Sequence, residues 1–272
     1  MSGILYLVAT PIGNLEDITL RAINVLSDVD LIAAEDTRQT LKLLNYLKIK
    51  KSLISYHRHN ENIKTMELIS RLLEGKNIAL VTDAGTPAIS DPGEEIVKQA
   101  IINNIKIIPI PGACALINAL ICSGLNTRHF SFYGFLPINK KNRKKIIEQI
   151  KKEDSTVILY EAPHKLIKTL NDLLDNLGNI EIVLAKEITK IHEDFIRGNI
   201  IDVIENLDNV KGEFIILLDL NNNLSENDES DKNLDELYTE FEKEGLEKKE
   251  IIKKIAKIKG VSKNEIYQHF LH

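Results

Sequence analysis

The stretch IALVTDAGTPAISDPGEEI, residues 78–96, contains the pattern that decides the fold. Its apolar start, Ile78–Thr82, predicts a buried strand, and a loop rich in glycine and proline follows. The motif Asp91-Pro92-Gly93-Glu94 then predicts a helix start, with Asp91 as the N-cap, proline in the first turn and glutamate three residues on. A strand, a loop and a helix in this order form the repeating unit of parallel α/β sheets.

The same alternation extends over roughly the first 125 residues. Amphipathic segments separate the strand candidates, and Ile18, Ala22 and Leu26, for example, share one face of a helix. Strands that alternate with helices favour a parallel sheet buried on both faces. The strand candidates are Ile4–Ala9, Leu31–Ala34, Leu53–Tyr56, Ile78–Thr82 and Ile105–Ile110.

From about residue 130 the regular alternation of strand and helix candidates changes. Two strand candidates, residues 182–187 and 194–198, follow each other closely enough to form a hairpin, which predicts a mixed sheet. The other strand candidates are Phe130–Phe135, Thr156–Glu161 and Glu213–Asp219, with helices near Lys141–Lys152, His164–Leu177 and Ile200–Asn206.

The end of the chain has a different composition. Residues 221–233, NNNLSENDESDKN, are polar and low in complexity, which is typical of a linker. Three short helices follow, separated at Gly245 and Gly260, and Ser262 is a candidate N-cap for the last. We therefore predict an α/β fold in four parts: a parallel-sheet N-terminal lobe at 1–115, a mixed-sheet C-terminal lobe at 116–220, the linker at 221–233 and a helical module at 234–272.

The overall composition is that of a soluble globular protein, with 43% hydrophobic and 28% charged residues among 272. No apolar run reaches the roughly 20 residues that span a bilayer, and the start lacks the basic segment of a signal peptide. We expect a cytoplasmic protein with no membrane partner. Cys114 and Cys122 lie eight residues apart, which suits neither a redox pair nor a zinc site, so we expect thiols in or near the core and no metal.

The formal net charge of −5 gives no global sign of nucleic-acid binding, but basic residues cluster locally. One cluster lies at 140–145, and another at 251–272, where five lysines face one acid. Either cluster suits RNA phosphates. The alternatives are a solvated helix face for the first, and for the second a helical appendage that packs on a partner subunit.

Three loops that follow strands combine glycine with proline: residues 10–14, 82–87 and 109–113. Ligands of parallel α/β sheets bind beyond the carboxyl ends of the strands, where glycine allows close approach to the backbone. Three such loops at one edge indicate a ligand cleft, although each alone is also typical of an ordinary turn. None is a GxxxxGK[ST] or GxGxxG loop, so the cleft is not a site for a polyphosphate. Asp83 could accept a hydrogen bond from a ribose or an amino group.

Several sequence blocks, in this order, resemble the tetrapyrrole-methylase superfamily: YLVATPIGNLEDITLRA, AAEDTR, SYHRHNE, ALVTDAGTPAISDPG, PIPGACA, FYGFLP, YEAPHK, AKEITKIHE and KGEF. The match covers roughly residues 3–219 and is most similar to the ribosomal RNA branch, which methylates the ribose 2′-oxygen of a cytidine in the decoding region of the small subunit. Members that modify porphyrins carry GxGPG in the first loop. The TPIGN of this sequence argues against a tetrapyrrole substrate.

The resemblance implies S-adenosylmethionine as the cofactor, bound in a cleft between the lobes mainly by backbone groups. It also implies a homodimer, with small-subunit ribosomal RNA or the assembled 30S subunit as the partner. The residues that would line the cofactor are Pro11, Gly13, Asp83, Ala84, Gly85, Pro87, Ala88, Ile89, Pro111, Gly112, Ala113, Phe135, Leu136, Tyr160 and Ala185.

A ribose hydroxyl is a poor nucleophile, so a base or a group that stabilises the developing alkoxide would help methyl transfer. We expect Glu35 and Arg38 of the EDTR block near the acceptor nucleotide, with His57 and His59 close by, and the sequence does not choose a base among them. A further set of candidates is Glu161, Lys186, Glu187 and Glu213. The alternatives are an ion-pair and capping cluster for the EDTR block, and a solvated loop for HRHN.

The favoured hypothesis is therefore 2′-O-methylation of ribosomal RNA by an S-adenosylmethionine-dependent enzyme. Two alternatives stay open at this point. One is a small-molecule methyltransferase of the same superfamily, acting on a precorrin or a similar ring. The other is a non-catalytic RNA-binding or assembly factor that retains the cofactor fold.

Overall fold

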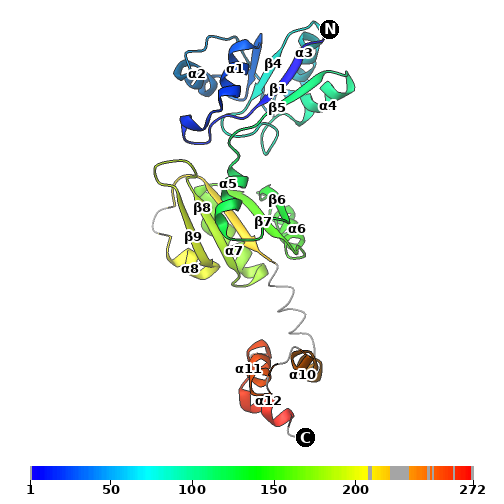
Figure 1. Ribbon diagram of the computed structural model, residues 1–272, viewed down its shortest axis with the longest axis vertical. Helices are drawn as coiled ribbons and strands as arrows, with labels where there is room; N and C mark the ends of the chain where they lie inside the picture. Colours follow the sequence, from blue (N-terminus) through cyan, green and yellow to red (C-terminus); the bar gives the residue numbers. More distant parts are fainter. Residues whose placement is uncertain are drawn as a thin grey trace.

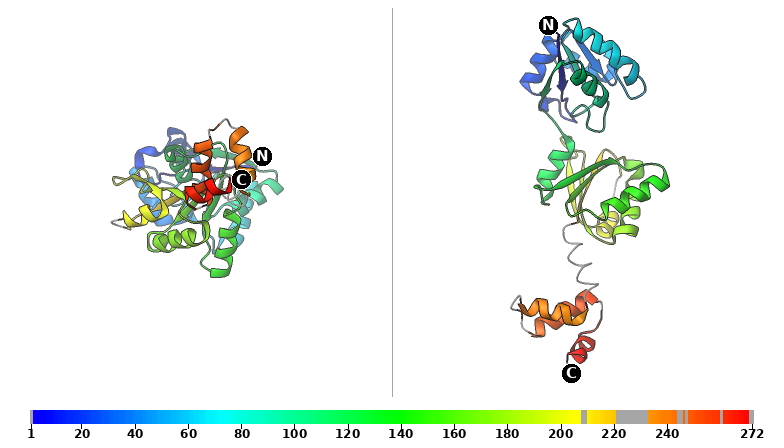
Figure 2. Two further views of the ribbon diagram at one scale, coloured as in Figure 1. Left: turned by 90° about the horizontal axis from the view of Figure 1, so that it is seen from below. Right: turned by 90° about the vertical axis from the view of Figure 1, so that its right-hand side faces the viewer.

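The computed structural model describes residues 2–207, 210–220, 233–243, 246, 248–259 and 261–270. Two α/β lobes and a group of three helices follow one another along the chain (Figures 1 and 2). Within the described residues, no helix is long and apolar enough to cross a membrane.

The N-terminal lobe is a five-stranded parallel sheet in the order β3-β2-β4-β1-β5. Alternate residues of each strand face opposite sides, which is why the sheet carries two cores. Leu31 and Ala33 of β2 pack toward α3 and α4, whereas Ile32 and Ala34 pack toward α1 and α2. The elements are β1 (Ile4–Val8), η1 (Leu15–Asp17), α1 (Leu20–Asp28), β2 (Leu31–Ala34), α2 (Thr37–Tyr46), β3 (Leu53–Ser55), α3 (Glu61–Leu73), β4 (Ile78–Val81), α4 (Glu94–Ile102) and β5 (Lys106–Ile110).

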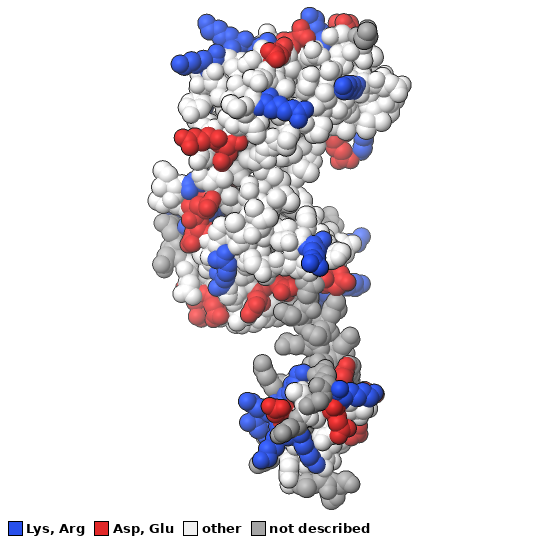
Figure 3. Space-filling model, viewed as in Figure 1, with Lys and Arg blue, Asp and Glu red and all other residues white. Residues whose placement is uncertain are grey.

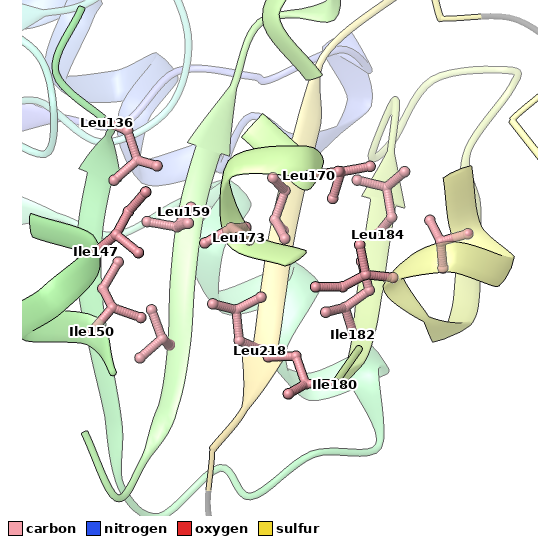
Figure 4. Close-up of a cluster of buried hydrophobic side chains, with 14 of the residues drawn as sticks. Leu136, Ile147, Ile150, Leu159, Leu170, Leu173, Ile180, Ile182, Leu184 and Leu218 are labelled. Carbon is pink, nitrogen blue, oxygen red and sulfur yellow. The ribbon is translucent and has the colours of Figure 1, made fainter. Parts of the chain in front are cut away.

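The C-terminal lobe is a mixed sheet in the order β6-β7-β10-β8-β9, in which β6 and β7 are parallel and the other pairs are antiparallel. One face packs on α6, α7 and α8 through a large aliphatic core (Figure 4). The other face packs on α5. The elements are α5 (Ala115–Ser123), β6 (Phe130–Phe135), α6 (Lys140–Ile150), β7 (Thr156–Glu161), α7 (Pro163–Leu177), β8 (Glu181–Lys186), β9 (Asp194–Asn199), α8 (Ile200–Glu205) and β10 (Phe214–Asp219).

The chain passes from the first sheet to the second between Ile110, where β5 ends, and Ala115, where α5 begins. The first loop of the N-terminal lobe also reaches the second lobe, because Ile12 packs against the α5 face of the second sheet. The lobes therefore meet at the carboxyl ends of the N-terminal strands, where the glycine and proline loops lie.

The last three helices are α10 (Leu234–Lys243), α11 (Lys248–Lys259) and α12 (Lys263–His269). They share a core of their own, which includes Leu237, Phe241 and Ile255. Ser262 caps α12 in a capping box with Glu265, as its position in the sequence predicts. Of the predicted linker 221–233, residues 221–232 lie outside the described residues.

The predicted α/β fold with one parallel and one mixed sheet is confirmed, and each predicted strand agrees with the structure to within one residue at either end. Two local predictions are wrong. Helix α4 takes Gly93 as its N-cap, not Asp91, because the loop before it extends two residues further than the capping pattern implies. Cys122 is exposed and only Cys114 is half-buried, so the predicted core position fails for Cys122.

Candidate active site

A cavity of about 520 Å³ lies between the two lobes, a size typical of small-molecule sites. The surface is hollowed between the lobes in the space-filling view (Figure 3). The cavity has apolar aromatic walls and several polar groups. It is lined by Ile12, Ala84, Gly85, Thr86, Ile89, Ser90, Asp91, Cys114, Ala115, Phe135, Tyr160, Glu161, Ala162, Pro163, His164, Ile188, Glu213, Phe214 and Ile215.

Two of the glycine loops are tied together at the cavity wall. The backbone N–H of Thr10 donates to the carbonyl of Gly85 at 2.9 Å, and the N–H of Gly85 donates back to Thr10 at 3.0 Å. Gly85 has a φ of +83°, and a Cβ there would lie 3.3 Å from a methyl carbon of Ile12. Glycine is therefore required both by the backbone conformation and by the narrow space.

Tyr160 forms the aromatic wall on the side of the second lobe. Its hydroxyl accepts a hydrogen bond of 3.2 Å from the backbone N–H of Leu116, at the start of α5. The rings of Phe132 and Phe135 pack edge-on against it, with centroids 4.9 Å and 5.6 Å away. Burial raises the pKa of Tyr160, so this wall stays uncharged.

An acidic edge adjoins the cavity where β2 and β4 end. The N–H of Asp36 donates to the Asp83 carboxylate at 3.0 Å, and the N–H of Asp83 approaches the Glu35 carboxylate at 3.4 Å. These reciprocal contacts hold the EDTR and TDAGTP blocks together. Burial raises the pKa of Glu35, and the neighbouring Asp83 carboxylate raises it further. Asp91 lies beside both groups and faces the cavity.

The segment after β3 completes this edge. Arg58 donates a hydrogen bond to the carbonyl of Ser90 and so ties the segment to the cavity loop. The backbone N–H of His57 donates a hydrogen bond of 2.8 Å to the Asn60 side chain, which stabilises the turn between these two residues. The Nδ1 atom of His57 is buried and has no hydrogen-bond partner among the described residues. The ring of His59 lies edge-on to it, with centroids 5.9 Å apart.

Arg38 points away from this cluster. Its guanidinium pairs with Asp36 at 2.6 Å, and its side chain is 87% exposed. Hydrogen bonds from Arg38 lower the pKa of Asp36 to about 2. An exposed arginine held in this way is suited to contact a ligand that approaches from solvent.

Residues 4–204 match the family described as Tetrapyrrole (Corrin/Porphyrin) Methylases. The chain belongs to this family. Among its relatives, Ribosomal RNA small subunit methyltransferase I of Halalkalibacterium halodurans is 48% identical, over 97% of this chain and 93% of that protein. The protein of the same name from Bacillus subtilis is also 48% identical, over 98% of this chain and 94% of its own length. The predicted resemblance to the ribosomal RNA branch of the tetrapyrrole methylases is confirmed.

Solved structures show the same fold at low sequence identity. Diphthine synthase superimposes with a TM-score of 0.66 at 14% identity, over 79% of this chain and 90% of that chain. Uroporphyrin-III-C-methyltransferase from Thermus thermophilus superimposes with a TM-score of 0.55 at 21% identity, over 82% of this chain and 98% of that chain. The two-lobed tetrapyrrole-methylase fold is therefore the fold of this chain.

Five of the residues predicted to line a cofactor lie in the cavity wall of this methylase fold: Ala84, Gly85, Ile89, Phe135 and Tyr160. Two others are turned into hydrophobic cores of the second lobe. Leu136 packs on the α6–α7 side (Figure 4), and Ala185 packs on the α5 side.

The remaining predicted cofactor residues are not among those that line this cavity. Pro11 and Asp83 line a second cavity of about 430 Å³ against α2. Gly13 lies against Thr189 and Lys190, and Gly112 packs on Ala9. The carbonyl of Ala113 accepts a 3.1 Å hydrogen bond from Thr86, which braces the loop that holds Pro87 and Ala88. Pro111 is exposed between the lobes.

Sequence reasoning named several residues of the wall that the second lobe contributes, among them Tyr160, Glu161 and Glu213, but it missed Asp91. The helix-start pattern assigned Asp91 a capping role that Gly93 takes in the structure. The YEAPH motif was the available signal for the second lobe, because Tyr160 to His164 form one continuous part of the wall. No group of three or more His, Cys, Asp or Glu side chains in the described part of the chain is arranged to hold a metal ion.

Proposed function

We propose that this chain transfers a methyl group from S-adenosylmethionine to the ribose 2′-hydroxyl of a cytidine in the decoding region of small-subunit ribosomal RNA. The observation that supports it most is the inter-lobe cavity with an acidic edge, in a chain 48% identical over nearly its full length to proteins named Ribosomal RNA small subunit methyltransferase I. The substrate is proposed to be that RNA, free or in an assembled 30S subunit. The active protein is proposed to be a cytoplasmic homodimer.

The residues of the cavity fit this methyl donor. The Ala84–Gly85 backbone leaves room for a flat base, and Phe135 and Tyr160 provide apolar surface around it. Pro11, Gly13, Pro87, Ala88, Pro111 and Ala113 are proposed to support these contacts rather than to make all of them. When bound, the sulfonium supplies an electrophilic methyl carbon.

The chain's own residues would position the acceptor for an in-line displacement, which is where most of the rate enhancement of such a reaction arises. Arg38 is exposed to solvent and is proposed to contact the RNA backbone near the acceptor nucleotide. Glu35, His57 and His59 are proposed to lie around that nucleotide. The apolar part of the cavity wall would also help to exclude water from the methyl carbon.

The test is an incubation of the purified protein with S-adenosylmethionine labelled in its methyl group and small subunits isolated from cells that lack the protein. We expect label in the RNA at a cytidine whose 3′ phosphodiester bond has become resistant to alkali, because 2′-O-methylation removes the attacking hydroxyl. Label on the base would contradict the proposed site of transfer. A parallel incubation replaces the small subunits by a precorrin. Label in that ring, together with none in RNA, would replace the proposal by the small-molecule alternative.

A further inference from the structure

Asp91 is a half-buried carboxylate in the cavity wall that makes no hydrogen bond within the described residues. The two other carboxylates of the wall are already engaged. Glu161 accepts a hydrogen bond of 2.8 Å from the N–H of Ala162 and a second from Thr169. Glu213 pairs with Lys190 at 3.0 Å. The packing of the protein therefore uses neither oxygen of Asp91, and a carboxylate can accept several hydrogen bonds from a ligand in the cavity.

The neighbouring acids at the edge, Glu35 and Asp83, do have hydrogen-bond partners within the protein. The Glu35 carboxylate is approached by the N–H of Asp83 at 3.4 Å, and the Asp83 carboxylate accepts from the N–H of Asp36 at 3.0 Å. Both act as ties between loops. Among the described residues, Asp91 is the one of these three acids that lines the cavity, and neither of its oxygens has a hydrogen-bond partner.

The loop that carries Asp91 is held in an unfavourable backbone conformation. Ala88 and Ser90 have φ values of +67° and +65°, which residues other than glycine rarely adopt. Arg58 and Thr86 fix the loop through hydrogen bonds to Ser90 and Ala113. Such strain is concentrated at functional sites, where it holds a side chain in place. Here it directs Asp91 into the cavity instead of onto the start of α4.

The charges around Asp91 suit proton transfer. From the N-terminal lobe it faces Glu35, Asp83 and Arg58, and from the second lobe Tyr160 and His164 belong to the same cavity. Burial raises the pKa of Asp91 to about 6; the carboxylates of Glu35 and Asp83 add to this effect, and Arg58 opposes it. A carboxylate with such a pKa is ionised at neutral pH and is a stronger base than an ordinary aspartate.

We propose that Asp91 is the proton acceptor for the ribose hydroxyl, an inference that rests on the proposed function. The Asp91 carboxylate takes the proton of the 2′-hydroxyl while the oxygen forms its bond to the methyl carbon. The bond between that carbon and sulfur breaks, and its electron pair remains on sulfur. The products are the 2′-O-methyl ether, S-adenosylhomocysteine and a protonated Asp91, which returns its proton to solvent.

The test compares Asp91→Asn with the wild type and with Glu94→Gln as a matched control. Glu94 lies three residues on and is exposed, paired with Lys98 at 2.7 Å. We expect Asp91→Asn to lower kcat for RNA methylation by at least about 100-fold, the usual contribution of a general base. We expect it to change the Kd for S-adenosylhomocysteine, measured by calorimetry, less than about twofold. Glu94→Gln should leave both quantities unchanged.

The pH dependence of kcat distinguishes a general base from a residue with a merely structural role, because only a base changes the pH profile. In the wild type, kcat should rise about tenfold for each pH unit and level off above about pH 6, where Asp91 is ionised. Asp91→Glu should show the same rise of kcat with pH at a lower rate. The residual activity of Asp91→Asn should not show this rise. Carbon NMR of labelled aspartate carboxyls should show one titration near pH 6 that is absent from Asp91→Asn.

The outcomes separate the two proposals. A wild type that transfers no methyl group to RNA refutes the proposed function and this inference with it. An active wild type with an equally active Asp91→Asn refutes the inference alone. Loss of S-adenosylhomocysteine affinity in Asp91→Asn would assign Asp91 to holding the cofactor instead.

Discussion

At the scale of the residue, Asp91 combines a functional position with a cost in stability. Its pKa in the folded protein, about 6, lies above the unfolded value of 3.8, so the folded state binds the proton more tightly. The stability this provides is present below about pH 4 and is lost as the pH rises through 6. We expect Asp91→Asn to be more stable than the wild type at pH 8 by about 1 kcal/mol, a figure discounted because half of the side chain faces solvent.

Urea denaturation at pH 8 and pH 4 measures this difference directly. At pH 4 the wild type is already protonated at Asp91, so the advantage of the variant should almost disappear. A variant that is less stable than the wild type at pH 8 would show that Asp91 supports the fold.

Gly85 offers a second test at this scale. Gly85 and Gly124 have nearly equal φ values, +83° and +85°, but only Gly85 lines the cavity, and a Cβ at Gly124 would meet open space. Substitution by alanine should cost each protein about 1–2 kcal/mol of stability, because both positions are left-handed. We expect only Gly85→Ala to weaken the binding of S-adenosylhomocysteine, by about tenfold or more in calorimetry. Equal affinities for the two variants would move the cofactor away from this loop.

The contrast between Asp91 and the strands shows what a sequence can predict. Strands buried on both faces, such as Leu31–Ala34, can be predicted from their composition, because every side chain in them must be apolar. The cap of α4 depends instead on the φ angles at Ala88, Ser90 and Gly93, which arise from contacts with residues distant in the chain. The glycine loops therefore predicted where the cavity lies, whereas the group without a hydrogen bond could be found only in the folded chain.

At the scale of the element, α6 presents lysines to solvent while its one arginine is turned inward. Arg143 is buried and pairs with Asp172 at 2.6 Å. Lys144 and Lys145 are exposed, as are Lys140 and Lys141 at the start of the helix. The helix begins five residues after Phe135, which lines the cavity. This arrangement favours contact between the lysines and the RNA backbone beside the acceptor nucleotide.

We expect Lys144→Glu with Lys145→Glu to weaken RNA binding and to lower the slope of log affinity against log salt by up to about 2, since each lost phosphate contact removes nearly one unit. The control is Lys151→Glu with Lys152→Glu, an equal change of charge beyond the far end of α6. Binding titrations at four salt concentrations provide the slopes. Identical slopes for the two double variants would mean that the lysines near the cavity form an ordinary solvated face.

At the scale of the whole molecule, we expect the helical module to be separable from the methylase lobes. Its helices α10–α12 share a core of their own, and the family match ends at residue 204, before the module begins. A relative named Ribosomal RNA small subunit methyltransferase I from Thermotoga maritima is 43% identical, and 98% of its length aligns with only 79% of this chain. That protein is therefore shorter by roughly the length of such a module.

We expect a chain that ends at Leu220 to keep the fold of both lobes and the same Kd for S-adenosylhomocysteine, because no described residue beyond Ile215 lines the cavity. Its affinity for small-subunit RNA should fall by about tenfold near 150 mM salt, since the module carries Lys253 and Lys263 on exposed positions. Calorimetry and filter binding measure the two affinities. If the truncated and full chains bind RNA equally at every salt concentration, the module has a role other than RNA binding. Packing on a partner subunit then becomes the leading explanation. A change in oligomeric state upon truncation, seen by sedimentation, would support that role.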